Sequence, residues 1–205
     1  MHSKPVLPEQ SKAPVPLSGN FYVRDEFTDT SLAMIYSMIR TPRERWYSLE
    51  DSKLLIRARN ESIDNMAQPS FIGRRQQHSY CSASTVLQYT LQNPGDKAGM
   101  VAFQNEEHYY FTGITLKEDG QAFVLEKGSA EGPVEMVSTT IDIANDAPVY
   151  IKIEARGKYY DFYYALEAGK WKLLQNDVDG MLLSTHVAGG FVGTYFGMYA
   201  YKSIR

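Results

Sequence analysis

The stretch of sequence that decides the fold is Gly189-Gly190-Phe191-Val192-Gly193-Thr194-Tyr195-Phe196-Gly197-Met198-Tyr199-Ala200-Tyr201, near the end of the 205-residue chain. A Gly-Gly pair permits a turn with positive φ, and the large residues that follow alternate with the period of a β-strand. One face would carry Phe191, Gly193, Tyr195, Gly197, Tyr199 and Tyr201. The opposite face would carry Val192, Thr194, Phe196, Met198 and Ala200, and its apolar members suit a hydrophobic core.

The face that carries Phe191 and Tyr195 alternates aromatic rings with glycines, which leave flat gaps between the rings. Two interpretations stay open for this face. The rings could stack on a sugar or on another protein, or they could simply cover the second face of a sandwich. Because two glycines precede Phe191, we expect its ring to project from the domain and to be at least partly exposed. We expect Phe196, on the opposite face, to be buried.

Most of the remaining chain shows the same alternation of large and small or polar residues, interrupted by short polar turns. The predicted strands are residues 46–49, 53–58, 70–76, 80–91, 98–104, 108–116, 121–127, 149–155, 159–166 and 171–174. Asp119-Gly120 predicts a tight hairpin turn, and Pro42 interrupts any helix over residues 32–40. We predict an all-β fold, a two-sheet antiparallel β-sandwich of the jelly-roll kind, with less than about 10% helix.

The composition divides the chain into two parts and limits the classes of partner to be expected. Residues 1–19 hold four of the nine prolines and predict a proline-rich linker, whereas residues 20–205 predict the β-sandwich. The net charge of -3 gives no reason to expect nucleic acid or an anionic membrane surface. No run of 18 apolar residues predicts a membrane span, and the N-terminus lacks the apolar core of a signal peptide, which favours the cytoplasm. The single Cys81 cannot form an internal disulfide, so cysteine usage does not decide the compartment.

The sequence predicts no catalytic residues, no metal ligands and no cofactor, with a structural calcium ion left open. Cleavage of a glycosidic bond needs two carboxylates facing one cleft, and no pair has that spacing. Glu106 and Glu107 are adjacent, Glu118 and Asp119 fall in a turn, and Asp177 and Asp179 are expected in a glycine-rich loop. The four histidines do not have metal-ligand spacing, Gly-x-Ser-x-Gly is absent, and Cys81 is expected to be a buried, inert thiol.

Three stretches together resemble the C-terminal concanavalin A-like β-sandwich domain of family 43 glycoside hydrolases, the β-xylosidases and α-L-arabinofuranosidases. Residues 71–78 resemble its Arg-Arg-Gln strand, and residues 24–27 followed by 46–49 resemble its opening. Residues 189–200 resemble its late Gly-Gly-Phe-Thr-Gly-Ala-Phe-Val-Gly-Met strand. The departures from that pattern are Val192, Thr194, Tyr195 and Phe196. The resemblance extends from about Phe21 to Ala200.

The resemblance implies a non-catalytic sandwich that packs on a five-bladed propeller, the domain that carries the catalytic carboxylates. In the family, the first Phe of the Gly-Gly-Phe turn reaches the substrate pocket of the propeller, and here that residue is Phe191. Tyr195 is a second expected sugar contact. The propeller and the family's last strand are absent from this chain, so we expect it to be part of a larger glycosidase. By itself the chain is not expected to be an enzyme.

Three functions from different classes remain in competition. The first is the accessory domain of a β-xylosidase or arabinofuranosidase that hydrolyses xylan-derived bonds, with the propeller and xylan or xylo-oligosaccharides as partners. The second is a stand-alone xylan-binding module whose aromatic face stacks on pyranose rings. The third is a catalytic lectin-type sandwich, which the missing carboxylate pair disfavours.

Overall fold

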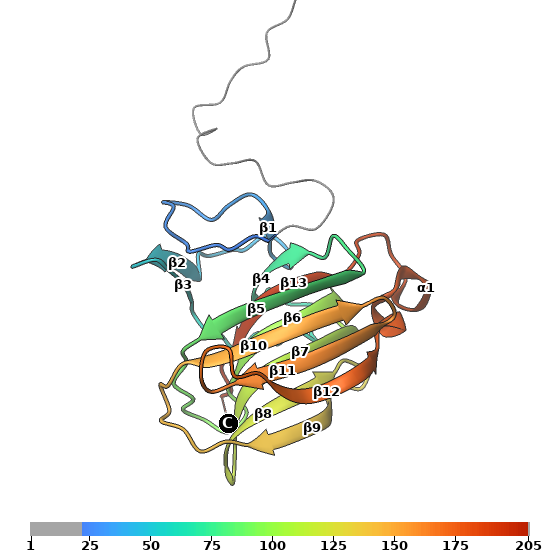
Figure 1. The fold of residues 1–205 in the computed structure, drawn as a ribbon. Coiled ribbons are helices and arrows are strands. Elements are labelled where there is room, and N and C mark those ends of the chain that lie inside the picture. Colours follow the sequence, from blue (N-terminus) through green and yellow to red (C-terminus); the bar gives the residue numbers. More distant parts are fainter. Residues whose placement is uncertain (1–21, 205) are drawn as a thin grey trace, which may run out of the picture.

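The computed structural model describes residues 22–204, and the predicted linker at residues 1–19 lies outside them. The predicted two-sheet antiparallel β-sandwich is confirmed (Figure 1). The larger sheet has seven strands in the order β1 (Tyr36–Ser37), β4 (Ser70–Arg75), β13 (Tyr195–Tyr201), β6 (Lys97–Asn105), β7 (His108–Lys117), β8 (Gly120–Lys127) and β9 (Val134–Thr140).

The smaller sheet has four strands and lies in front of the larger one in Figure 1. Its order is β12 (Lys172–Asp179), β11 (Tyr159–Ala165), β10 (Val149–Arg156) and β5 (Tyr80–Leu87). A separate hairpin pairs β2 (Tyr47–Glu50) with β3 (Lys53–Ile56). The described residues hold two short helical turns, a 3-10 helix η1 (Gly180–Leu183) and α1 (Thr185–Ala188), in agreement with the predicted low helix content.

The main hydrophobic core fills the space between the two sheets. On β10, Val149, Ile151 and Ile153 are fully buried, while the residues between them are only partly buried. The alternation in the sequence thus identifies the face of the strand that packs in the core. Phe162 and Phe123 pack into the same core from the two sheets. Burial of these side chains supplies the main driving force for holding the two sheets together.

A second core covers the outer face of the seven-stranded sheet. Phe71, Val101, Phe111 and Tyr199 belong to it, together with Ile63 from the segment that precedes β4. The main-chain N–H of Ile63 donates to the hydroxyl of Tyr199 at 3.2 Å. The central strands are covered on both faces. Nearly all residues of β6, β7 and β8 are therefore buried, and burial does not alternate along these strands.

The strand around which the fold was predicted begins later than the alternation suggested. β13 starts only at Tyr195, because Gly193 has a φ of +76° and breaks the extended backbone. Val192, expected in the core, is therefore 51% exposed, and that prediction was wrong. Phe196 is buried, as predicted.

The gap that Gly197 leaves on the other face of β13 is not open. The ring of Phe71, from the neighbouring strand β4, lies against Gly197 and Gly73. Tyr199 on the same face is 4% exposed. This part of the aromatic-glycine face is therefore packed inside the protein and is not a flat surface for a ligand.

Other boundaries also differ from the predictions. β9 and β1 were not predicted, because the first is a solvent-facing edge strand and the second is only two residues long. β5 ends at Leu87, before the expected end at residue 91. Asp177 and Asp179 lie in β12 and not in a glycine-rich loop, because β12 extends further along the edge of β11 than its apolar residues indicate.

Candidate functional site: the Phe191 loop and the adjoining depression

The loop between α1 and β13 carries the Phe191 side chain. Gly189, Gly190 and Gly193 all have a positive φ, between 68° and 76°. A side chain would strain the backbone at these positions, whereas glycine adopts such angles freely. The chain therefore turns sharply on both sides of Phe191, and the ring is left fully exposed.

Two side chains at the end of β6 hold the start of this loop. The amide of Asn105 donates to the carbonyl oxygen of Ala188 at 3.0 Å, and the amide of Gln104 donates to that of Gly189 at 3.3 Å. On the far side of the loop, the Thr194 hydroxyl donates to the carbonyl oxygen of Leu183 at 3.2 Å. Phe191 is thus exposed on a loop whose two ends are both hydrogen-bonded to the domain.

The helical turns before the loop are capped by short polar side chains. The Asp179 carboxylate accepts from the N–H of Met181 at 2.9 Å, and the Ser184 hydroxyl accepts from that of Val187 at 3.3 Å. Asp and Ser are preferred at such positions because they satisfy N–H groups that have no partner within the helix. The Tyr110 hydroxyl donates to the Asp179 carbonyl at 2.9 Å and ties these turns to β7.

Tyr195, the second predicted sugar contact, lies in a different environment from Phe191. It is partly buried and packs against the second core. The Arg75 guanidinium lies over its ring, 5.4 Å from the ring centroid, and donates to its hydroxyl at 3.2 Å. One face of the ring is therefore occupied by a cation, and only the phenol end and the ring edge remain for another group.

Phe196, which follows the loop on β13, packs against Tyr160 in the main core. Their rings meet edge to face with centroids 6.1 Å apart. The Tyr160 hydroxyl donates to the side-chain oxygen of Gln76 at 2.6 Å, and burial raises the pKa of this phenol. A phenol with a raised pKa stays protonated at neutral pH and can keep donating to Gln76.

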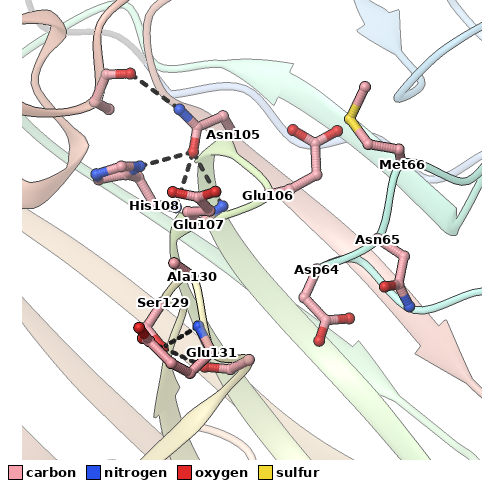
Figure 2. A pocket seen from close by; sticks show the side chains of 12 residues that line it. Asp64, Asn65, Met66, Asn105, Glu106, Glu107, His108, Ser129, Ala130 and Glu131 are labelled. Atoms are coloured by element: carbon pink, nitrogen blue, oxygen red, sulfur yellow. Dashed lines mark hydrogen bonds between the residues drawn. The ribbon is translucent and has the colours of Figure 1, made fainter.

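A depression of about 520 Å³ adjoins the anchored end of the loop at Ala188 (Figure 2). Its polar lining comes from three segments that precede β4, join β6 to β7, and follow β8. The side chains that give it an acidic character are Asp64, Glu106, Glu107 and Glu131. The Asn105 side-chain oxygen accepts hydrogen bonds from the main chain of Glu107 and His108, so Asn105 organises both the depression and the loop.

The carboxylates of this depression are not arranged as a glycosidase pair. Glu106 and Glu107 occupy the tight turn between β6 and β7, and Glu106 forms an ion pair with Arg40 at 2.5 Å. Among residues 22–204, Asp64 Oδ1 is shielded from solvent and has no hydrogen-bond partner. The depression can accept hydrogen bonds from hydroxyl or amino groups, which is binding chemistry and not acid–base catalysis.

The remaining predicted candidates lie elsewhere. Cys81 on β5 is only partly buried, not fully buried as expected. It donates to the His78 carbonyl at 3.1 Å, and burial raises its pKa, which favours the protonated thiol at neutral pH. The part of the chain that the structure describes contains no group of three His, Cys, Asp or Glu side chains able to hold a metal ion. None of its helices is long and apolar enough to cross a membrane.

The sequence predicted that Phe191 is exposed but did not identify the residues that anchor its loop. Asn105 contacts Ala188 across 83 residues of sequence, and Gln104 contacts Gly189 across 85. Neither residue belongs to a local motif. No sequence signal could have linked them to the loop, because the link depends on β6 pairing with β13.

Comparison with characterised proteins points to one group of enzymes. The chain is similar to a xylosidase/arabinosidase of Butyrivibrio fibrisolvens, with 31% identity over 85% of this chain and 33% of the relative. It is also similar to xylosidase/arabinosidase 43B of Humicola insolens, with 27% identity over 84% of this chain and 34% of that protein. The chain thus spans about a third of the length of these relatives.

Solved structures agree in fold. The xylan β-1,4-xylosidase of Bacillus halodurans superposes with a TM-score of 0.79 at 24% identity, over 90% of this chain and 37% of the enzyme. The model of the β-xylosidase C-terminal concanavalin A-like domain matches residues 24–204. This chain belongs to that family, the C-terminal concanavalin A-like domain of β-xylosidases.

Proposed function

We propose that this chain is a non-catalytic accessory domain that packs on a family 43 catalytic propeller and places Phe191 at the edge of its substrate pocket. The substrates would be xylan-derived glycosides, because the relatives are named as xylosidases and arabinosidases. The match to only a third of each relative supports a partner domain that supplies the chemistry.

The observation that carries this proposal is the contrast between the exposure of Phe191 and the anchoring of its loop. A fully exposed phenylalanine gains nothing in the domain by itself, since its apolar surface stays in water. The bonds from Asn105, Gln104 and Thr194 nevertheless fix both ends of the loop. Anchored loop ends lower the entropic cost of ordering the loop when a ligand binds, which suits a binding role for Phe191.

For Tyr195 we propose a smaller role. Its hydroxyl accepts from Arg75, which leaves the phenolic proton able to donate to a sugar hydroxyl. Replacement by Phe would test this, because the ring packing stays and only the donor is lost.

The direct test joins this chain to a catalytic propeller. The C-terminal third of the Butyrivibrio fibrisolvens relative is replaced by this chain, and hydrolysis of an aryl xyloside is measured. In Phe191→Ala we expect kcat/KM to fall about tenfold, mainly through KM, since the lost ring contact acts on substrate binding. Phe191→Tyr, which keeps the ring, should restore most of the loss.

The control variant is Met136→Ala, an exposed apolar side chain on the edge strand β9. It should leave both kinetic constants unchanged. If Phe191→Ala behaves like this control in a fusion that is active, Phe191 does not reach the substrate and the proposal fails.

A further inference from the structure

The outer face of the four-stranded sheet is a second candidate binding surface, separate from the Phe191 loop. The solvent-facing side of an antiparallel sheet is normally polar. Here the outward positions of β5, β10 and β11 and the turn before β12 carry five aromatic residues among charged and hydroxyl groups. These aromatic residues are Tyr80, Tyr150, Tyr159, Tyr163 and Trp171.

At one end of this face lies a depression of about 470 Å³, within the range of small-ligand sites. Tyr80, Ser82, Glu154 and Arg156 line it, which brings together an aromatic ring, a hydroxyl, a carboxylate and a guanidinium. Ser82 faces Glu154, and Tyr80 faces Arg156, across the β5–β10 pair.

The Tyr80 ring is exposed and lies beside the β10–β11 turn. It is 75% exposed, and its hydroxyl lies over Gly157 in the β10–β11 turn, where an added Cβ would come within 3.1 Å of that hydroxyl. Gly157 also has a φ of +68°, so glycine is favoured there by both the backbone and the ring above it. The ring therefore forms one wall of the depression.

The other end of the face carries a second aromatic group. The Lys152 ammonium lies 4.0 Å from the centroid of the Tyr163 ring and 5.4 Å from that of Trp171. Lys152 and Arg156 are four residues apart on β10, which corresponds to about 13 Å along an extended strand. The two ends are thus separated by more than one sugar ring, so a ligand that touches both would be an oligomer.

Two of the cations on the face are paired with carboxylates. Lys152 contacts Glu154 at 3.4 Å, and Arg156 contacts Asp161 at 2.5 Å and Asp177 at 2.6 Å. The Lys158 ammonium, 5.0 Å from the centroid of the Tyr159 ring, is a third cation on this face. Three cations thus stand beside three carboxylates, which gives no net attraction for a polyanion such as nucleic acid. Paired charges still offer N–H donors and carboxylate acceptors, which is suitable chemistry for the hydroxyl groups of a neutral ligand.

From these features we propose that the outer face of the four-stranded sheet binds a linear, neutral polysaccharide chain. The apolar C–H faces of its sugar rings would stack on Tyr80 and Trp171, and its hydroxyl groups would bond to Ser82, Glu154 and Arg156. That this polysaccharide is the main chain of xylan rests on the proposed function. This face does not include Phe191 and would hold the polymer, whereas Phe191 would act at the end that is cleaved.

The test uses the full 205-residue chain in native gels that contain soluble arabinoxylan, together with calorimetric titration with xylohexaose. The wild-type chain should be retarded in the gel. Tyr80→Ala and Trp171→Ala should each bind xylohexaose roughly tenfold more weakly, as expected for losing one stacking ring. Tyr80→Phe, which keeps the ring, should bind as well as the wild type.

The matched control is Tyr22→Ala, which removes a tyrosine that is 82% exposed but lies before β1 and outside this sheet. It should leave the retardation unchanged. A wild-type chain that is not retarded, or Tyr80→Ala and Trp171→Ala variants that bind like the control, would overturn the inference. Neither result would affect the role proposed for Phe191, which is measured with a short aryl xyloside in the propeller fusion.

Discussion

Asn105 and Ala188 are 83 residues apart in sequence, and the side-chain amide of Asn105 donates to the main-chain carbonyl of Ala188 at 3.0 Å. The Asn105 oxygen accepts at the same time from the N–H of His108 at 2.9 Å. One side chain thus joins the β6–β7 turn to the Phe191 loop. The arrangement requires a group that both donates and accepts, which an amide provides and a carboxylate does not.

Replacing Asn105 with Asp should therefore loosen the Phe191 loop. The aspartate can still accept from His108, but it places a negative oxygen against the Ala188 carbonyl and leaves that carbonyl unsatisfied. We expect a loss of about 1–3 kcal/mol in the free energy of unfolding. Amide hydrogen exchange over residues 185–193 should also become faster. Asn65→Asp adds the same charge to the same depression without removing this bond, and it should change neither measurement.

The two phenylalanines of the Gly189–Tyr201 stretch should respond in opposite ways to truncation. Phe196 is buried between the sheets, so Phe196→Ala should cost about 3–5 kcal/mol in denaturant unfolding. Phe191 is fully exposed, so Phe191→Ala should change stability by less than about 0.5 kcal/mol. Equal, large losses would mean that Phe191 packs in a core, and its functional interpretation would have to be abandoned.

Gly197 should not tolerate even a methyl group. An added Cβ would overlap the Phe71 ring and lie 2.9 Å from the Cα of Gly73. Gly197→Ala should lower the free energy of unfolding by about 1–3 kcal/mol, the usual cost of overpacking a core. Gly169→Ala is the comparison. A Cβ added at Gly169 would meet no atom within 4 Å, so the only destabilisation comes from the backbone strain of its φ of +78°, about 1 kcal/mol. A Gly197→Ala melt indistinguishable from that of Gly169→Ala would contradict the packing described for the second core.

The Arg156–Asp161 pair should contribute a pH-dependent part of the stability. Hydrogen bonds from Arg156 hold the pKa of the Asp161 carboxyl below its ordinary value of 3.8. A carboxyl with a lowered folded-state pKa stabilises the fold above its unfolded-state pKa, and this contribution is lost as the pH falls through the folded-state value. Asp161→Asn should thus destabilise the protein at neutral pH, and the difference from the wild type should shrink only below about pH 3.8.

Urea unfolding curves at several pH values would measure this difference. Asp142→Asn, at an exposed position, serves as the control and should stay parallel to the wild type throughout. A constant difference between Asp161→Asn and the wild type from neutral to strongly acidic pH would show that the Asp161 carboxyl is not coupled to folding as described.

The isolated chain should not hydrolyse aryl xylosides or arabinosides. The carboxylates beside the Phe191 loop lie in turns, and Glu106 is engaged by Arg40, so among these four described side chains no acid and nucleophile or base face each other across a cleft. Release of the aryl group, followed by its absorbance, should equal the rate in buffer. Turnover that a single Asp or Glu substitution in this chain abolishes would contradict this prediction.

The strands themselves were predictable wherever one face is buried and the other is not. β10 shows this most clearly, because Ile151 and Ile153 must be inside while Lys152 and Glu154 stay at the surface. The two hairpin strands β7 and β8 were also found, since Asp119-Gly120 specifies a tight turn. β9 was not found, because a solvent-facing edge strand has little apolar periodicity to detect.

By itself, the amino-acid sequence determined the fold class, the exposure of Phe191 and the burial of Phe196, because these depend on local periodicity and on glycine backbone freedom. Only the tertiary structure decided that the Phe71 ring fills the gap at Gly197 and that Asn105 holds Ala188. Both contacts join segments that are distant in sequence and meet only through strand pairing, so their geometry follows from the sheet order and not from any local pattern.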